Sequence, residues 1–229
     1  MHAVIGGNGP ALVLIHGFPQ TWWAWRHMMP QLASRHTVVA VDLRGAGHSD
    51  KPQGGYDKAS LAADVHGVMT AWTSTSTRSA ATTSAPALAL THRDAVTRLT
   101  VLDASQPGWS RWMANSHEQK VWQFAFHMKR DPPELLIRGR EFDYVSTFIY
   151  DRACDLGAHP VADIEEFARS LKQPGNLRGG LEWYRAFPVD HENALVWKRE
   201  PLMIPCWLSE GSTRTVCRSY RCCKSSGLT

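Results

Sequence analysis

Two polar residues stand directly after apolar runs, where a side chain leaves a sheet and becomes available for chemistry. His16 follows Ala11–Ile15, and Asp103 follows Leu99–Leu102. An imidazole exchanges protons near neutral pH, and a carboxylate orients such a group or attacks a carbon atom. Each residue also has a purely structural interpretation, because a histidine can simply hold its loop in place and a strand-end aspartate often caps a helix or a turn.

The first 72 residues predict the elements that hold His16. The continuous apolar runs Ala11–Ile15 and Thr37–Leu43 are typical of buried parallel strands. Apolar residues at helical spacing predict helices over Thr21–Arg35, with its first residue as N-cap, and over Ala59–Trp72. Strands that alternate with helices predict a parallel sheet with crossover helices, which is an α/β fold.

The segment 73–84 interrupts this order. Nine of its twelve residues are Ser or Thr, and none is a large apolar residue. A buried parallel strand needs apolar side chains on both faces. We therefore expect the sheet to lack a strand at this position.

The pattern resumes after residue 87. Leu88–Arg93 ends a helix, and Leu99–Leu102 forms a strand. From Gly108 to about Glu192 the sequence is helical and rich in aromatic residues, and Leu202–Leu208 begins one more strand. After that strand we expect no further regular pattern.

Several motifs, taken in this order, resemble the α/β-hydrolase superfamily. They are His16-Gly17-Phe18-Pro19 with the Trp-x-Trp-Arg of Trp23–Arg26, the loop Asp42–Asp50, the strand Leu99–Asp103, and Gln173–Gly175 followed by Glu182–Ala186. The last pair is similar to the lid of epoxide hydrolases and haloacetate dehalogenases. The resemblance covers about residues 2–72 and 87–205.

The resemblance implies an α/β-hydrolase fold, a mostly parallel sheet with flanking helices and a helical lid, or cap domain. The core would span residues 1–107, with 73–86 aberrant, and the lid would span 108–198. Residues 199–229 would hold a remnant of a returning strand and an aberrant tail. We expect the core to be incomplete at both ends, because Met1–Ile5 resembles the middle of a strand that the family precedes with another.

A mechanism also follows from the resemblance. In this family an aspartate on a sharp strand-to-helix turn attacks a substrate carbon, and a histidine-activated water hydrolyses the resulting ester. The site residues implied here are the oxyanion region His16, Gly17, Phe18 and Pro19, the candidate orienting acid Asp103, the lid donor Tyr184 with Tyr144 or Tyr150 as a second tyrosine, and the pocket residues His127 and Met128. Met128 replaces the tryptophan of a halide-binding His-Trp pair, which favours an epoxide over a haloacetate.

The nucleophile and the general-base histidine cannot be identified. The nucleophile turn needs flanking glycines, yet no glycine lies between Gly67 and Gly108, and the last histidine is His191. Codons for Trp72–Ser84 can be chosen so that a one-base shift spells a strand followed by Gly-His-Asp-x-Gly. We therefore hypothesise a frameshift in this segment and a second one after about Cys206, with a truncated product.

Three functions remain open at this point. The first is a hydrolase that adds water to a small apolar epoxide, or displaces a halide from an organohalide, without cofactor or metal. The second is a catalytically dead, poorly folded relic. The third is a non-catalytic module that binds a ligand in the lid pocket.

Composition excludes other classes. The formal net charge of +4 equals the four basic residues of the stretch 212–229, which has no acidic residue, so we expect no nucleic-acid partner. The five cysteines fit no zinc-site spacing. No apolar run approaches the roughly 18 residues of a membrane span, and the N-terminus lacks a signal-peptide pattern, so we expect a cytoplasmic protein without membrane contact.

Overall fold

The apolar runs of the sequence become strands of one sheet. The computed structural model describes residues 1–72, 77–81, 85–102, 122–151, 153, 155–210 and 213–217, without the side chains of 77–81, 208–210 and 213–217. Within these residues the sheet has seven strands, which are β1 (Ala3–Gly6), β2 (Ala11–Ile15), β3 (Thr37–Val41), β4 (Thr77–Ala81), β5 (Val96–Leu102), β6 (Cys206–Glu210) and β7 (Thr213–Cys217).

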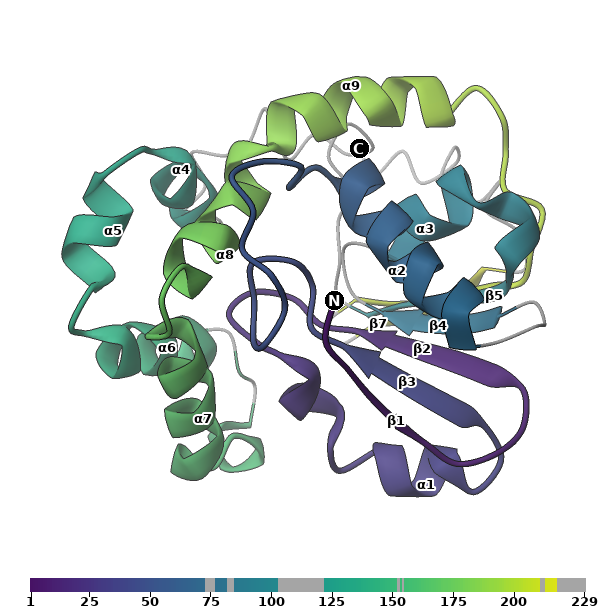
Figure 1. Ribbon diagram of the computed structural model, residues 1–229, viewed down its shortest axis with the longest axis horizontal. Helices are drawn as coiled ribbons and strands as arrows, with labels where there is room; N and C mark the ends of the chain where they lie inside the picture. Colours follow the sequence, from purple (N-terminus) through teal and green to yellow (C-terminus); the bar gives the residue numbers. More distant parts are fainter. Residues whose placement is uncertain are drawn as a thin grey trace.

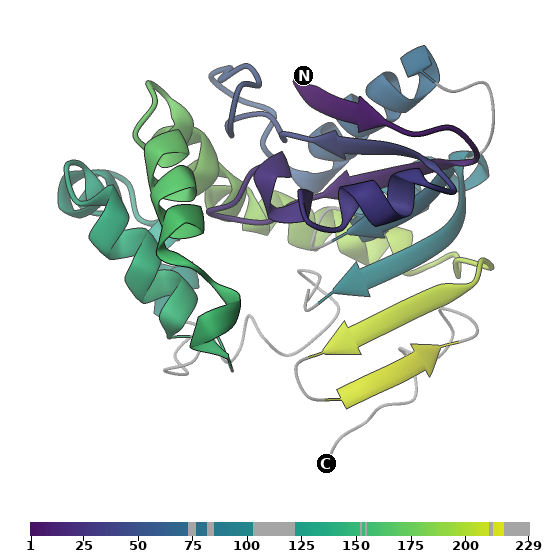
Figure 2. The same ribbon diagram turned by 90° about the horizontal axis from the view of Figure 1, so that it is seen from below.

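The strand order is β1-β3-β2-β4-β5-β6-β7 (Figures 1 and 2). The five inner strands, from β3 to β6, run parallel to one another, whereas β1 and β7 pair antiparallel with β3 and β6. The parallel sheet that the sequence predicts is therefore confirmed. Its edges are closed by short antiparallel strands.

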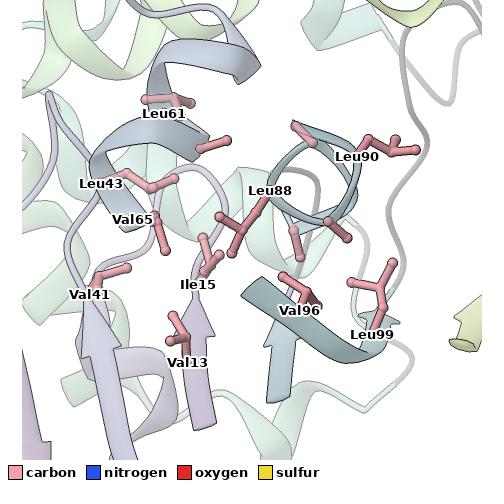
Figure 3. Packing of buried hydrophobic residues seen from close by; sticks show 14 of the residues in the cluster. Val13, Ile15, Val41, Leu43, Leu61, Val65, Leu88, Leu90, Val96 and Leu99 are labelled. Carbon is pink, nitrogen blue, oxygen red and sulfur yellow. The ribbon is translucent and has the colours of Figure 1, made fainter. Parts of the chain in front are cut away.

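Helices cover both faces of the sheet. They are the 3₁₀ turn η1 (Trp22–Trp25) and helix α1 (Met29–Ala33) before β3, α2 (Lys58–Trp72) before β4, and α3 (Ala85–Thr91) with the turn η2 (Arg93–Ala95) before β5. Val13 and Ile15 of β2 pack toward α2 and α3, as Figure 3 shows, whereas Leu12 and Leu14 pack toward α1. Burial on both faces explains why β2 is apolar at every position.

The predicted helix over Thr21–Arg35 is divided in two. Thr21 caps the first turn as expected, because its side chain accepts a hydrogen bond from Trp23 N at 3.3 Å. Pro30 stands in the first turn of α1, where its missing N–H costs nothing. Pro30 has no N–H to donate to the carbonyl group four residues before it, so the first helical turn cannot continue unbroken and α1 begins as a separate helix.

The prediction that the sheet lacks its next strand is wrong. Thr77–Ala81 forms β4, which pairs in parallel with β2 on one side and β5 on the other. The ladder is made by backbone N–H and C=O groups, which every residue of this segment carries, and threonine favours strand geometry. Apolar side chains are usual in a buried parallel strand, but the backbone hydrogen bonds form β4 although this segment lacks them.

The tail after Cys206 also departs from the prediction. The strand expected at Leu202–Leu208 is present as β6, although it begins at Cys206. The predicted loss of all pattern after it is wrong, because Thr213–Cys217 forms β7 and pairs antiparallel with β6. The β-branched residues Thr213, Thr215 and Val216 supply the strand propensity.

The second half of the described chain is helical, as expected. Its elements are α4 (Trp122–Met128), α5 (Pro132–Ile137), α6 (Glu141–Tyr150), the turn η5 (Leu156–Ala158), α7 (Val161–Leu171), α8 (Asn176–Arg185) and α9 (Phe187–Trp197). Helices α4 to α8 gather at one side of the sheet, and α9 returns over α2 (Figure 1). A separate apolar cluster, which includes Val145, Ile164 and Leu181, joins α6, α7 and α8. None of the described helices is long and apolar enough to cross a membrane.

Helix α8 lies directly on the loop after β3. Gly179 and Gly45 approach so closely that a Cβ atom built on Gly179 would lie 2.4 Å from the Cα atom of Gly45. Next to this contact, Trp183 Nε1 donates to the carbonyl oxygen of Arg44 at 3.0 Å, and Asn176 Nδ2 donates to that of Gly47 at 3.1 Å. The two segments meet backbone to backbone and are held by side-chain hydrogen bonds on either side.

A buried ion pair joins α9 to α2. The side chains of Lys58 and Asp190 are 4% and 1% exposed, and Lys58 Nζ lies 3.5 Å from Asp190 Oδ2. The other carboxylate oxygen accepts a hydrogen bond from Lys58 N at 2.6 Å, at the first turn of α2. Burial raises the pKa of Asp190, and the Lys58 ammonium opposes that rise.

Removing one partner of the Lys58–Asp190 ion pair is expected to lower the free energy of unfolding strongly. Asp190→Ala leaves the Lys58 ammonium buried without its partner, so we expect a loss of about 3–5 kcal/mol in the free energy of unfolding. Urea unfolding followed by circular dichroism measures this loss. The control is Glu166→Ala, which removes an exposed pair with Arg169 and is expected to cost no more than about 1 kcal/mol. Equal losses for the two variants would contradict the prediction.

The glycine contact gives a second prediction. Gly179→Ala forces α8 away from the loop, since the atom in its path is backbone, and we expect a loss of about 1–3 kcal/mol in stability. Gly67→Ala in α2 is the matched control, because its Cβ meets nothing within 4 Å. That variant is expected to gain about 0.5–1 kcal/mol. Thermal melts of both variants test the pair, and a stable Gly179→Ala protein would refute the close contact.

Candidate active site

The topology indicates where a ligand would bind. The connection from β2 leads to β3 on one side of it, whereas the connection from β4 leads away to β5. In open α/β sheets ligands bind at such a reversal, outside the carboxyl ends of the strands. The residues that follow these strand ends are His16 after β2, Asp42 after β3, the segment 82–84 after β4 and Asp103 after β5.

Two of these four positions lie outside the described residues. The chain passes from β4, which ends at Ala81, to α3, which begins at Ala85. A strand followed by a helix is the setting that a nucleophile turn requires. The hypothesised frameshifted reading covers residues 72–84, of which 82–84 lie outside the described residues, so its nucleophile turn and the candidate acid Asp103 stay predictions.

His16 is held by both of its ring nitrogens. The residue is 1% exposed, Nδ1 lies 3.0 Å from the carbonyl oxygen of Gly17, and Nε2 accepts a hydrogen bond from Leu43 N at 3.1 Å. The Leu43 contact requires a lone pair on Nε2, so the proton sits on Nδ1. Burial lowers the pKa of His16, which keeps the ring neutral. The ring thus ties the loop after β2 to the residue that follows Asp42.

Asp42 is a residue that the sequence analysis did not single out. It is fully buried, and its carboxylate accepts hydrogen bonds from Trp22 N at 2.8 Å and His48 N at 3.1 Å. His2 Nδ1 lies 2.7 Å from the same carboxylate. Its position directly after a strand, like that of Asp103, was the available signal. Its bonds to backbone N–H groups indicate that it fixes the loops around the strand ends.

Four of the candidate site residues lie close together beyond the carboxyl ends of the parallel strands. The ring of Phe18 lies 4.9 Å from that of His127 and 5.6 Å from that of Tyr184, centroid to centroid. His127 and Tyr184 are 4.3 Å apart, and His127 Nε2 is hydrogen-bonded to the hydroxyl of Tyr144. We call Phe18, His127, Tyr144 and Tyr184 the aromatic cluster. It joins the loop after β2 to α4, α6 and α8.

Two other predicted residues, Tyr150 and Met128, are not part of the aromatic cluster. The hydroxyl of Tyr150 donates to the carbonyl oxygen of His159 at 3.5 Å, at the opposite end of α6 from Tyr144. Met128 is half-buried at the end of α4. Of the two tyrosines that the sequence left open, the structure brings Tyr144 to Tyr184. Among the described residues no group of three or more His, Cys, Asp or Glu side chains is placed to hold a metal ion.

Arg44 has a structural role in the loop after β3. Its guanidinium contacts both carboxylate oxygens of Asp64 on α2, at 2.5 and 2.6 Å. This bidentate pair raises the pKa of Arg44. The loop after β3 is therefore attached to α2 as well as to α8.

The fold, its strand-end site and its sequence agree with one family. Residues 10–204 match the α/β hydrolase fold family, and the chain belongs to it. The chain is 32% identical to the soluble epoxide hydrolase of Corynebacterium sp. strain C12, over 90% of this chain and 75% of that one. It is 30% identical to a fluoroacetate dehalogenase of Burkholderia sp., over 83% of this chain and 68% of the relative.

A solved structure shows the same architecture. The crystal structure of Cfl2 from Burkholderia cenocepacia superposes with a TM-score of 0.83 at 33% sequence identity, covering 90% of this chain and 74% of that one. These comparisons confirm the resemblance and the fold class that the sequence motifs indicated. The chain is thus similar to hydrolases of the epoxide hydrolase and dehalogenase type.

The buried, neutral His16 predicts a pH-dependent stability. The pKa of an unfolded histidine is about 6.5, and that of folded His16 is lower, so the unfolded chain binds the proton first as the pH falls. Stability therefore decreases below that pH, by at most about 1.4 kcal/mol per pH unit from this residue. Urea unfolding between about pH 7.5 and about pH 5.5 measures the slope.

His16→Gln should flatten that slope. The control is His92→Gln, because the pKa of the more exposed His92 is also lowered by burial and by neighbouring His66. We expect a larger flattening for His16→Gln than for His92→Gln. The reverse order would contradict the prediction that His16 contributes more than His92 to the loss of stability at low pH.

Proposed function

We propose that this chain is built as an α/β-hydrolase of the epoxide-hydrolase type, with a pocket for a small apolar epoxide between a core and a helical lid. The core corresponds to residues 1–107, the lid to 108–198, and residues 199–229 return to the sheet. The observation that carries the proposal is the aromatic cluster, which brings two lid tyrosines to Phe18 at the carboxyl edge of the sheet.

The chemistry of the cluster suits an epoxide. Its rings offer apolar contact to a small hydrocarbon group, and a phenol hydroxyl can donate a hydrogen bond to an oxygen that gains negative charge. When an epoxide ring opens, a C–O bond breaks and that oxygen becomes an alkoxide. A donor aimed at this oxygen lowers the barrier because the charge forms only in the transition state. We assign this role to Tyr184, with Tyr144 as the second tyrosine.

The nucleophile is the missing part of this proposal. In the mechanism that the resemblance implies, a carboxylate forms an ester with the substrate carbon and water then hydrolyses it. No Asp or Glu occurs anywhere in residues 73–91, the segment that contains β4 and α3. We therefore propose that the chain as written binds but does not turn over substrate, and that an aspartate belongs to the frameshifted reading of residues 72–84. Asp103 is the proposed orienting acid.

Dehalogenation is the second candidate. The identity to the fluoroacetate dehalogenase and the hydrogen bond between His127 and Tyr144, two polar groups that can face a leaving halide, favour it. Met128, in place of a tryptophan donor, favours the epoxide. A chain that only binds ligands, or a relic that does not fold, is distinguished by a melt: a single cooperative transition excludes the relic.

Turnover tests the proposal directly. The gene is first read again across the codons for residues 69–90 and 202–229, and the chain as written and a version with both segments in the shifted frame are expressed. We expect hydrolysis of styrene oxide by the shifted version only, and faster hydrolysis of styrene oxide than of fluoroacetate. If the chain with the given sequence hydrolysed substrate, and a change of Asp103 abolished this activity, the proposal that the chain lacks a nucleophile would be contradicted.

In the active version, substitutions of Tyr184 and Tyr150 are expected to have different effects on kcat/KM. Tyr184→Phe removes one donor to the developing oxyanion, so we expect kcat/KM to fall by about 10²-fold or more. Tyr150→Phe is the matched control, because its hydroxyl is engaged with His159 away from the aromatic cluster, and we expect little change. Equal effects of the two changes would remove Tyr184 from its assigned role.

A further inference from the structure

Two histidine rings are stacked where helices α2 and α3 meet. His66 lies in α2, and His92 is the residue between the end of α3 and the turn η2. Their ring centroids are 4.0 Å apart and the ring planes differ by 2°, so the rings lie face to face. Both residues are half-buried. The pair is not part of the aromatic cluster, and the proposed hydrolysis does not use it.

The stacked pair belongs to the contact between the helices before and after β4. Helices α2 and α3 pack against each other and share an apolar cluster that includes Val65 and Leu88 (Figure 3). The backbone N–H of His92 donates to the carbonyl oxygen of Leu88 at 2.9 Å, which joins His92 to the last turn of α3. A movement of the His92 ring away from His66 would therefore disturb the end of α3 first.

The stability of this contact depends on how many protons the two rings carry. A histidine becomes charged at about pH 6.5, so both rings can be charged in mildly acidic solution. Two neutral rings, or one neutral and one charged ring, can stack, whereas two positive charges at this distance repel each other. Burial lowers the pKa of His92, and the charge of His66 lowers it further.

The charged groups of the neighbouring elements have other partners or do not act on His92. Lys58 and Asp64 of α2 are in the ion pairs described above, and Arg93 Nε of η2 lies 3.7 Å from Glu200 Oε2. Helix α3 has no titratable residue. The other titratable residues with described side chains on η2, β5, α9 and the segment after α9 are Asp94, Arg98, Asp190, His191, Glu192, Lys198 and Arg199. Among the described residues, His66 carries the charge that shifts the pKa of His92.

We propose that His66 and His92 form a proton-sensitive contact, which holds α3 to α2 while at most one ring is charged and releases the end of α3 when both rings are charged. A histidine whose pKa is lowered in the folded protein binds its proton more tightly once the contact is open. The contact is therefore stable above about pH 6.5 and weakens as the pH falls below that value. It makes the packing around β4 sensitive to acid, whether or not the chain turns over substrate.

Hydrogen exchange of the full chain at two pH values tests the release. We expect the His92 amide to exchange about tenfold faster at about pH 5.5 than at about pH 7.5, after correction for the intrinsic effect of pH. The amides of β3 report global unfolding and are expected to change less. No change at His92, or an equal change at His92 and in β3, would overturn the proposal.

A substitution of His66 separates the role of its charge from a merely structural role. His66→Gln keeps a polar side chain that does not take up a proton, so we expect the pKa of His92, measured by NMR titration of its ring, to rise. The acid effect on the His92 amide should fall to about threefold or less. If either quantity is the same as in the unmodified chain, or if protection is lost equally at both pH values, the proposal is wrong.

Two further variants complete the experiment. His27→Gln is the matched control, because His27 is exposed between η1 and α1, and it should change neither the pKa of His92 nor the acid effect. His92→Gln removes the other ring and tests the proposal if His66→Gln does not fold. We expect the acid effect on the amide of residue 92 to fall to about threefold or less in this variant as well. An undiminished acid effect in His92→Gln would overturn the proposal.

Discussion

The burial of one carboxylate sets the arrangement of the loops at the carboxyl edge of the sheet. Asp42 has no exposed surface, and a buried charge is tolerated only when donors surround it. The donors come from three separate segments: His2 before β1, Trp22 at the first turn after the His16 loop, and His48. Gly47 is required in the same turn, because a Cβ there would lie 2.1 Å from the carboxylate. Satisfying Asp42 thus fixes the entry to the sheet and two of its strand-end loops together.

The lid helices are attached to this fixed edge as well as to one another. Helix α8 lies on the turn that Asp42 holds, and α9 reaches α2 through the ion pair of Lys58 with Asp190. Phe187, at the start of α9, lies between Tyr184 and the Lys58 ammonium, which is 5.4 Å from its ring. Tyr184 is consequently placed by contacts that lead back to the sheet on both sides. The aromatic cluster is positioned by the core as much as by the helices that carry it.

The sequence predicted those parts of the molecule in which side chains determine the structure. The apolar runs that became β2 and β3, the helix before residue 72 and the motif loops follow from burial on two faces, from helical spacing and from strand-end geometry. The strands β4 and β7 were not predicted, because their sequences lack an apolar pattern. Their backbone hydrogen bonds form all the same, since Ser and Thr do not prevent strand pairing. The role of Asp42 could not be predicted from the sequence, because the three segments that donate to its carboxylate lie from 6 to 40 residues away. Tyr144 could not be separated from Tyr150 by pattern, since only the turn of α6 decides which hydroxyl reaches His127.

The contact of Gly45 with Gly179 has a consequence for how this protein can be varied. Where two side chains meet, a larger residue on one side can be compensated by a smaller one on the other. Two glycines have no side chain that could be made smaller. The seam between lid and sheet therefore has no pair of compensating substitutions at this point. Helix α5 offers freer positions. Leu135 and Leu136 are 80% and 53% exposed there, so their side chains can be replaced without changing the packing of the aromatic cluster. A combinatorial library aimed at a new substrate would keep both glycines constant and place its diversity on the far helices of the lid.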